Sequence, residues 1–219
     1  MPVAETPPLV DCCPLSVCEP ATVAGLVHAF QSATPILLRQ GWRDEPEPGF
    51  KPATVRTGWS PEALLIFAEL DDLDIFNRST RLNERAWELG DVFEIFLQAE
   101  GEQGYVEFHV TPENQRVQLC FAGPCERGHP IEGDAFRSRV WVRPELQKWA
   151  VYAEVFAPSV TCRPGSLEGR RWRFSFSRYD YTRGRVAPVL SSSSPHRELS
   201  FHRLHEWGSL SFSTRSRTK

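Results

Sequence analysis

Residues 87–98 read Trp-Glu-Leu-Gly-Asp-Val-Phe-Glu-Ile-Phe-Leu-Gln, and this stretch decides the fold class. Side chains alternate along a β-strand, so the apolar residues of 92–98 fall on both faces, and Glu94 is the one charged side chain among them. Two apolar faces are typical of a central strand that is covered on both sides. Because an unpaired buried carboxylate is costly, Glu94 either has a buried partner or lies in a binding groove.

The composition fits one folded unit that needs no metal or disulfide for its core. A chain of 219 residues buries roughly 70% of its unfolded surface. The formal charge of -3 is small, and no block of like charge suggests a nucleic-acid partner or an anionic membrane surface. The chain has no run of 18 consecutive apolar residues, so we predict no membrane-spanning segment.

Residues 1–20 carry neither a basic segment nor an apolar segment of the kind found in secretory signals. We therefore expect a cytoplasmic location and reduced thiols for the six cysteines, which form no Cys-x-x-Cys pair. A metal site at Cys12, Cys13 and Cys18 is the alternative interpretation, but no fourth ligand is suggested nearby. A proline-rich arm explains the segment better.

The rest of the chain predicts an all-β fold, an antiparallel β-sandwich with about ten strands and one short helix. Residues 1–33 are interpreted as an N-terminal arm and the helix (21–31), 34–213 as the sandwich, and 214–219 as a tail. The predicted strands alternate with turn-rich joints and lie at 35–39, 53–57, 63–70, 91–99, 105–111, 116–121, 135–143, 148–156, 171–178 and 208–213. Two longer loops, 71–90 and 179–207, are candidates for carrying function.

A polar face follows the opening strand. Glu107 and His109 alternate with apolar residues in 105–111, and Gln118 alternates with them in 116–121. With Glu94 they form a candidate set of groups lining one face of the sheet. Carboxylates, histidine and glutamine exchange hydrogen bonds with hydroxyl groups, and aromatic rings stack on the apolar faces of sugars. A solvated sheet face is the alternative interpretation.

Several segments in order along 34–213 carry a family resemblance. They are 54–72, Trp87 with Gly-Asp-Val-Phe-Glu-Ile-Phe (90–96), Tyr-Val-Glu-Phe-His-Val (105–110), Lys-Trp-Ala-Val-Tyr-Ala-Glu-Val-Phe (148–156), Arg-Trp-Arg-Phe-Ser-Phe-Ser-Arg-Tyr-Asp (171–180) and Phe-His-Arg-Leu-His-Glu-Trp-Gly-Ser-Leu-Ser-Phe (201–212). Together they resemble the family 9 carbohydrate-binding modules and their DOMON-like relatives. The motif at 90–96 is the most specific of them.

The resemblance implies a jelly-roll-like sandwich that binds a mono- or oligosaccharide between two aromatic rings without transforming it, in support of carbohydrate catabolism. It makes Trp87 one ring and Glu94 a hydroxyl acceptor, and it places His109 where the family usually has an arginine. The second ring belongs in the loop after the penultimate strand. The typical tryptophan is absent there, and Tyr179 or Tyr181 stands in its place.

The same resemblance bears on cofactors. No cofactor is required, but some family members carry a structural calcium ion. Asp71, Asp72 and Asp74 offer oxygen ligands of the kind that calcium prefers, at the end of a strand. A solvated turn is the alternative explanation.

Two other functions stay open. Glu94 and Glu107 could act as the carboxylate pair of a glycoside hydrolase, which needs a separation of roughly 5–9 Å. Haem binding, known among DOMON-like relatives, would need axial histidines, because the one methionine is Met1. The candidate ligands for haem are His109, His129, His202 and His205. The chain has no Gly-x-Ser-x-Gly motif and no phosphate-binding glycine loop.

Overall fold

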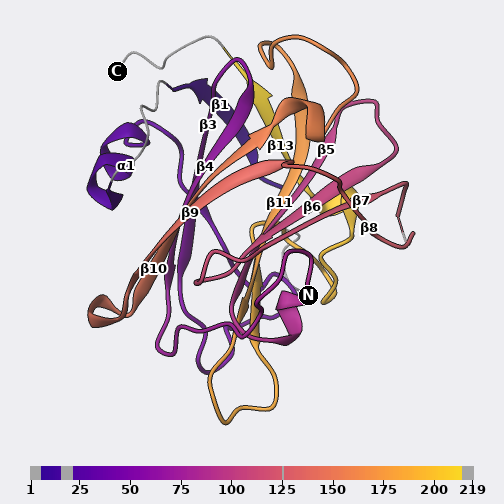
Figure 1. Ribbon diagram of the computed structural model, residues 1–219. Helices are drawn as coiled ribbons and strands as arrows, with labels where there is room; N and C mark the ends of the chain where they lie inside the picture. The colour runs from indigo at the N-terminus through magenta and orange to yellow at the C-terminus, as the bar shows by residue number, and fades with distance from the viewer. Residues whose placement is uncertain (1–5, 16–21, 125, 214–219) are drawn as a thin grey trace.

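A computed structural model describes residues 6–15, 22–124 and 126–213. Over these residues the chain forms thirteen strands in one curled mixed sheet, with one short α-helix (Figure 1). The elements in chain order are β1 (Leu9–Pro14), α1 (Val23–Ala29), β2 (Ile36–Leu37), β3 (Ala53–Trp59), β4 (Ala63–Asp71), β5 (Val92–Ala99), β6 (Tyr105–Val110), β7 (Arg116–Phe121), β8 (His129–Pro130), β9 (Phe136–Arg143), β10 (Lys148–Phe156), β11 (Arg171–Asp180), β12 (Val189–Ser192) and β13 (Gly208–Phe212). Single turns of 3-10 helix lie at Ala86–Glu88, Pro144–Leu146, Ala157–Ser159 and Leu204–Glu206.

The strand order is β8-β7-β6-β5-β11-β13-β1-β3-β4-β10-β9, with β12 paired to β11 and β2 to β3. β1 runs parallel to both of its neighbours, first along β13 and then along β3, while the other pairs are antiparallel. β1 therefore joins the two halves of the sheet. The prediction of an extended arm over residues 1–20 is wrong for this segment, and the sheet is mixed rather than purely antiparallel.

The sheet curls around one hydrophobic core that draws on both halves. Phe93 and Ile95 of β5 belong to it, as do Leu64 and Ile66 of β4. All eight residues of β5 are buried, so the prediction of a central strand covered on both sides is confirmed. Such a strand forms because every second residue contacts the core, while the others lie beneath loops on the outer face.

Helix α1 covers the outer face of β4 and β10. The side chain of Thr22 caps the helix by accepting a hydrogen bond from the Gly25 backbone N–H (3.1 Å). Phe30, just after the helix, is fully buried and packs against Phe67 and Tyr152 in a second, smaller core. Among the described residues, no helix has the length and apolar character needed to cross a membrane.

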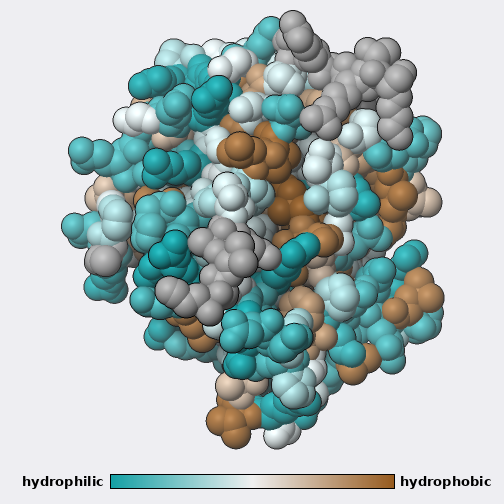
Figure 2. Space-filling view, turned by 180° about the vertical axis from the view of Figure 1, so that it is seen from behind, coloured by the Kyte–Doolittle hydropathy of each residue, from teal (hydrophilic) through white to brown (hydrophobic). Residues whose placement is uncertain are grey.

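The all-β fold is confirmed, and each of the ten predicted strands is present with similar bounds. The predicted number was too low, since β1, β8 and β12 were missed. Cys18 of the alternative metal site and the predicted tail lie outside the described residues. Seen from behind, the surface is largely hydrophilic, with hydrophobic residues gathered in a hollow near its centre (Figure 2).

Candidate functional site

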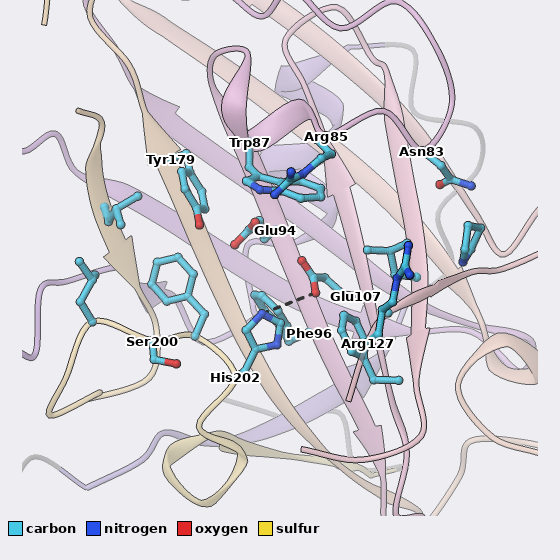
Figure 3. Close-up of a pocket in the computed structure, with 17 residues that line it drawn as sticks. Asn83, Arg85, Trp87, Glu94, Phe96, Glu107, Arg127, Tyr179, Ser200 and His202 are labelled. Carbon is cyan, nitrogen blue, oxygen red and sulfur yellow. Dashed lines mark ion pairs between the residues drawn. The ribbon is translucent and has the colours of Figure 1, made fainter. Parts of the chain in front are cut away.

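A cavity of about 710 Å³ lies on the outer face of the β5–β6–β7 half of the sheet (Figure 3). Strands provide its floor and one wall, and three loop segments enclose it. The strand residues are Glu94, Phe96, Glu107, Leu119, Phe121, Pro130, Tyr179 and Leu190, and the residues outside strands are Asn83, Arg85, Trp87, Arg127, Gly128, Leu199, Ser200, Phe201 and His202. A cavity of this size is in the usual range for small-ligand sites.

The strand register brings the polar floor together. Glu94 lies directly opposite His109 on β6, and Glu107 lies between Phe96 on β5 and Leu119 on β7. Directly opposed residues of an antiparallel pair point to the same face. Alternation along β5 and β6 therefore places Glu94, Glu107 and His109 on one face, as predicted from the sequence.

These three residues form a buried charged cluster. His109 Nε2 makes a hydrogen bond with Glu107 Oε1 and lies 3.3 Å from Glu94 Oε1. His109 is fully buried, and the carboxyl groups are nearly so. Among the described residues, Glu94 Oε2 and His109 Nδ1 have no hydrogen-bond partner. Buried polar atoms without partners are costly, so this arrangement needs an explanation outside the fold itself.

The cluster perturbs its own proton affinities. Burial raises the pKa of Glu94 to about 8; the charge of His109 opposes this shift, and the charge of Glu107 adds to it. Burial alone would lower the pKa of His109, but the Glu94 and Glu107 carboxylates outweigh it and raise that pKa. Protons are thus retained in the cluster at pH values where isolated groups would have lost them.

Trp87 stands above this cluster on a single 3-10 turn. Its half-buried ring meets His109 edge-on at 5.2 Å, and the Arg85 guanidinium lies 5.3 Å from its centre. The turn is tied down by Asn77, whose Nδ2 donates to the backbone oxygens of Ala86 and Asp91. The predicted ring is therefore held in place on the cavity.

The structure separates the two tyrosines proposed for the second ring. Tyr179 lines the cavity and packs edge-on against Phe201 at 5.9 Å. Tyr181 lies outside the cavity lining and donates its hydroxyl hydrogen bond to the backbone oxygen of Trp87 (2.8 Å). Figure 3 shows Trp87 and Tyr179 to either side of the Glu94 carboxyl group. Burial is the main cause that raises the pKa of the Tyr179 hydroxyl, and the nearby Glu94 charge adds to it, so the hydroxyl stays protonated.

Gln118 does not reach the cavity. It lies opposite Phe108, which belongs to the core face, so its side chain points to the other side of the sheet. There Nε2 donates to the backbone oxygens of Ile131 and Gly133. Its placement with the other polar groups was wrong, because the register across the β6–β7 turn puts Leu119 on the cavity instead.

Several lining residues were missed by sequence reasoning. The most informative is His202, whose Nδ1 lies 2.8 Å from the Tyr105 hydroxyl and whose Nε2 lies 4.0 Å from Glu107 Oε2. Phe201 and His202 were part of the family motif in the sequence, but nothing in that motif placed them over β5, β6 and β7. Of the histidines considered for haem, His109 and His202 both approach Glu107, whereas His129 and His205 are exposed and do not line the cavity.

The three aspartates proposed for calcium have separate partners. Asp71 pairs with Lys148 at 3.0 Å, and Asp72 with Arg178 at 2.9 Å. Asp74 forms an ion pair with an exposed arginine. Calcium binding at this turn stays a prediction.

A second buried acidic cluster lies outside the cavity lining. Asp72, Asp91 and Asp180 bring carboxylate oxygens within 4.8 Å of one another, and Arg178 inserts its guanidinium among them, 3.3 Å from Asp180. Burial raises the pKa of Asp91 to about 8 and that of Asp180 to about 6, with Arg178 opposing both shifts. Asp91 also accepts hydrogen bonds from the backbone of Phe76 and of Tyr181, so this cluster fixes the segments that carry Trp87 and Tyr179.

The chain has the fold of the family 9 carbohydrate-binding modules. The solved structures similar to it include a protein from Bacteroides uniformis ATCC 8492 for which carbohydrate binding has been proposed (18% identity, TM-score 0.77, 95% of this chain and 100% of that chain). They also include a family 9 module from Caldicellulosiruptor kristjanssonii, in complex with cellotriose (14% identity, TM-score 0.68, 96% of each chain) and with glucose (14% identity, TM-score 0.60, 99% of this chain and 97% of that chain). At these identities the similarity shows the fold alone. No family model matches the sequence, and no curated protein matches it.

Proposed function

We propose that the protein binds a saccharide in the cavity between Trp87 and Tyr179 without transforming it. The observation that carries this proposal is the pair of half-buried rings standing beside the unsatisfied carboxyl group of Glu94. The ligands of the structurally similar family 9 module, glucose and cellotriose, have the matching chemistry. Their pyranose rings offer apolar faces for stacking and hydroxyl groups for hydrogen bonds.

In this mode Trp87 stacks on one face of the sugar ring, and Tyr179 contacts it from the other side. Glu94 Oε2 takes a hydrogen bond from a hydroxyl group, which satisfies an atom that has no partner otherwise. Glu107 on the floor and His202 on an enclosing loop also line the cavity and offer further polar contacts. Desolvation by the surrounding rings strengthens each of these bonds.

The cavity continues past His202 into a second groove of about 880 Å³, and Phe121, Ser200 and His202 line both. This continuity supports a ligand longer than one sugar. Affinity should then rise from a monosaccharide to the corresponding di- and trisaccharide.

A glycan array on the full chain, followed by titration calorimetry with the best ligand, tests the proposal. Trp87→Ala should raise Kd about five- to thirty-fold, which corresponds to about 1–2 kcal/mol of lost stacking and burial. Trp141→Ala is the matched control, because Trp141 is also half-buried but packs in the small core beside α1. Equal affinity in the wild type and in the Trp87 variant would overturn the site assignment.

One observation favours hydrolysis as a second candidate. Glu94, with a pKa raised to about 8, stands beside Glu107, an arrangement that resembles an acid–nucleophile pair. Against it, the structurally similar family 9 module is a carbohydrate-binding module, and the single His109 Nε2 contacts both carboxyl groups. We expect no release of reducing sugar from a polysaccharide panel; turnover that is lost in Glu94→Gln would reverse the choice.

Two further points belong to the proposal. We infer a cytoplasmic role in carbohydrate catabolism, which fractionation of cells expressing the full-length protein would test.

Calcium binding by Asp71, Asp72 and Asp74 predicts a higher melting temperature in calcium chloride than in EDTA.

A further inference from the structure

Glu94 has an unused coordination capacity. Its side chain is only 3% exposed, and Oε2 has no hydrogen-bond partner among the described residues. Figure 3 shows Glu94 and Glu107 next to each other below Trp87, with Glu107 paired to His202. A buried carboxylate oxygen without a donor calls for a cation or a ligand donor at that point.

The cluster brings three metal-ligating groups together, with a hydrogen bond between His109 Nε2 and Glu107 Oε1 that an ion would have to replace. Three possible ligand atoms lie within 4.8 Å of one another, one each from Glu94, Glu107 and His109. The 3.3 Å between His109 Nε2 and Glu94 Oε1 matches the edge of a tetrahedron whose bonds to the metal are roughly 2.0–2.1 Å. His202 Nε2 lies 4.0 Å from Glu107 Oε2, so a second imidazole is close enough to approach the same point.

We propose that Glu94, Glu107 and His109 form a binding site for a divalent transition-metal ion at the floor of the cavity. A divalent ion that replaces the protons shared within the cluster would neutralise the two ionised carboxylates, which a single imidazolium charge does only by half. Imidazole nitrogen with carboxylate oxygen is a donor set for zinc or manganese, whereas calcium and magnesium prefer oxygen alone. The remaining coordination positions face the cavity, where His202 or a ligand oxygen can fill them.

The second acidic cluster shows why this site is distinct. Asp72, Asp91 and Asp180 converge as closely, but the guanidinium of Arg178 already lies among them and supplies the positive charge. A metal ion would have to displace that buried arginine. No arginine or lysine makes an ion pair with Glu94 or Glu107 among the described residues.

Titration calorimetry on the EDTA-treated and dialysed full chain tests the site, with zinc, manganese, calcium and magnesium chlorides as separate probes and no sugar present. We expect one zinc or manganese ion per chain, bound at least ten-fold more tightly than calcium or magnesium. Glu94→Gln should weaken this binding at least ten-fold. His205→Gln is the control, because His205 is exposed and lies outside the cluster.

Cobalt(II) supplies a second readout on the unsubstituted protein. An intense visible absorption band would show bound cobalt in a low-symmetry site, and X-ray absorption would count imidazole ligands, so the test holds even if a variant fails to fold. One or two imidazoles together with carboxylate oxygens support the proposal. Failure of both zinc and manganese to bind overturns it, as does zinc binding whose affinity is unchanged by Glu94→Gln or is lost in His205→Gln. Because no arm contains a saccharide, these outcomes are independent of the glycan array.

Discussion

We expect Arg178→Met to lower the free energy of unfolding by about 3–5 kcal/mol, the usual effect of breaking a buried ion pair from one side. Arg178 is 1% exposed; its Nη1 donates to the backbone oxygen of Asp71 (2.6 Å), and its Nη2 donates to Asp72 (2.9 Å) and lies 3.3 Å from Asp180. Methionine fills much of the same volume without charge or donors. The substitution therefore leaves two buried carboxyl groups without a counter-charge.

For a chain of 219 residues this loss corresponds to a fall in melting temperature of about 6–20 °C, at about 2–4 °C for each kcal/mol. The effect should reach the cavity. Asp72 precedes the loop that carries Trp87, and Asp180 directly follows Tyr179, so repulsion between the two carboxyl groups loosens both sides of the site.

Urea denaturation followed by tryptophan fluorescence measures the change, with Arg183→Met as the matched control. Arg183 is 64% exposed and pairs with Asp74 at the surface, where an ion pair contributes about 0–1 kcal/mol. Adding Asp72→Asn to Arg178→Met should restore part of the lost stability. A difference between the two arginine variants of less than about 1 kcal/mol would refute the reasoning.

Three other outcomes follow from the structure. The free energy of unfolding should fall as the pH rises from about 4.5 to 8. Burial raises the pKa of Glu94 from 4.5 to about 8, and the carboxylates raise the pKa of His109, so the folded state binds protons more tightly than the unfolded state. Melting temperatures that rise across this range would contradict the expectation. Gly90→Ala should cost about 3 kcal/mol in urea titrations, because Gly90 has φ +151° and a Cβ there would overlap the backbone oxygen of Phe76; a cost below 1 kcal/mol would show that the turn can shift. Phe30→Ala should lower the free energy of unfolding by about 3–5 kcal/mol, since it empties a fully buried position beneath α1. A loss well below that range in the same urea titrations would contradict this expectation.

The sequence predicted the strands well where the pattern was local. Ten strands were found because alternation or continuous apolar runs mark them without knowledge of their partners. β1 was missed because Pro8 precedes it, Pro14 is its last residue, and its alternation rests on two buried side chains, Val10 and Cys12. β1 forms by parallel pairing with β13 and β3, and such pairing leaves no local pattern in the sequence. β8 and β12 are two and four residues long, too short to carry a period.

The residues of the candidate site were likewise predicted where a local pattern determines their position, and missed where it does not. Glu94, Glu107 and His109 were placed on one face because alternation within a strand and the short β5–β6 hairpin determine it. Gln118 was assigned to that face by its polarity, whereas its true side depends on the register set by the next turn. His202 could not be placed at all, since a long loop positions it and no periodicity relates that loop to the sheet.

The two outer faces of the sheet also argue for a ligand at Glu94. Helix α1 closes the outer face of β4 and β10 with apolar residues such as Leu26 and Phe30, which stabilise the fold directly. The outer face of β5 and β6 is closed instead by loops laid over ionisable groups, and it retains a cavity of about 710 Å³. Apolar residues at the same positions would have avoided the cost of burying these charges. The cluster is a costly way to close a sheet face, and the proposed cation or hydroxyl donor at Glu94 Oε2 would offset that cost.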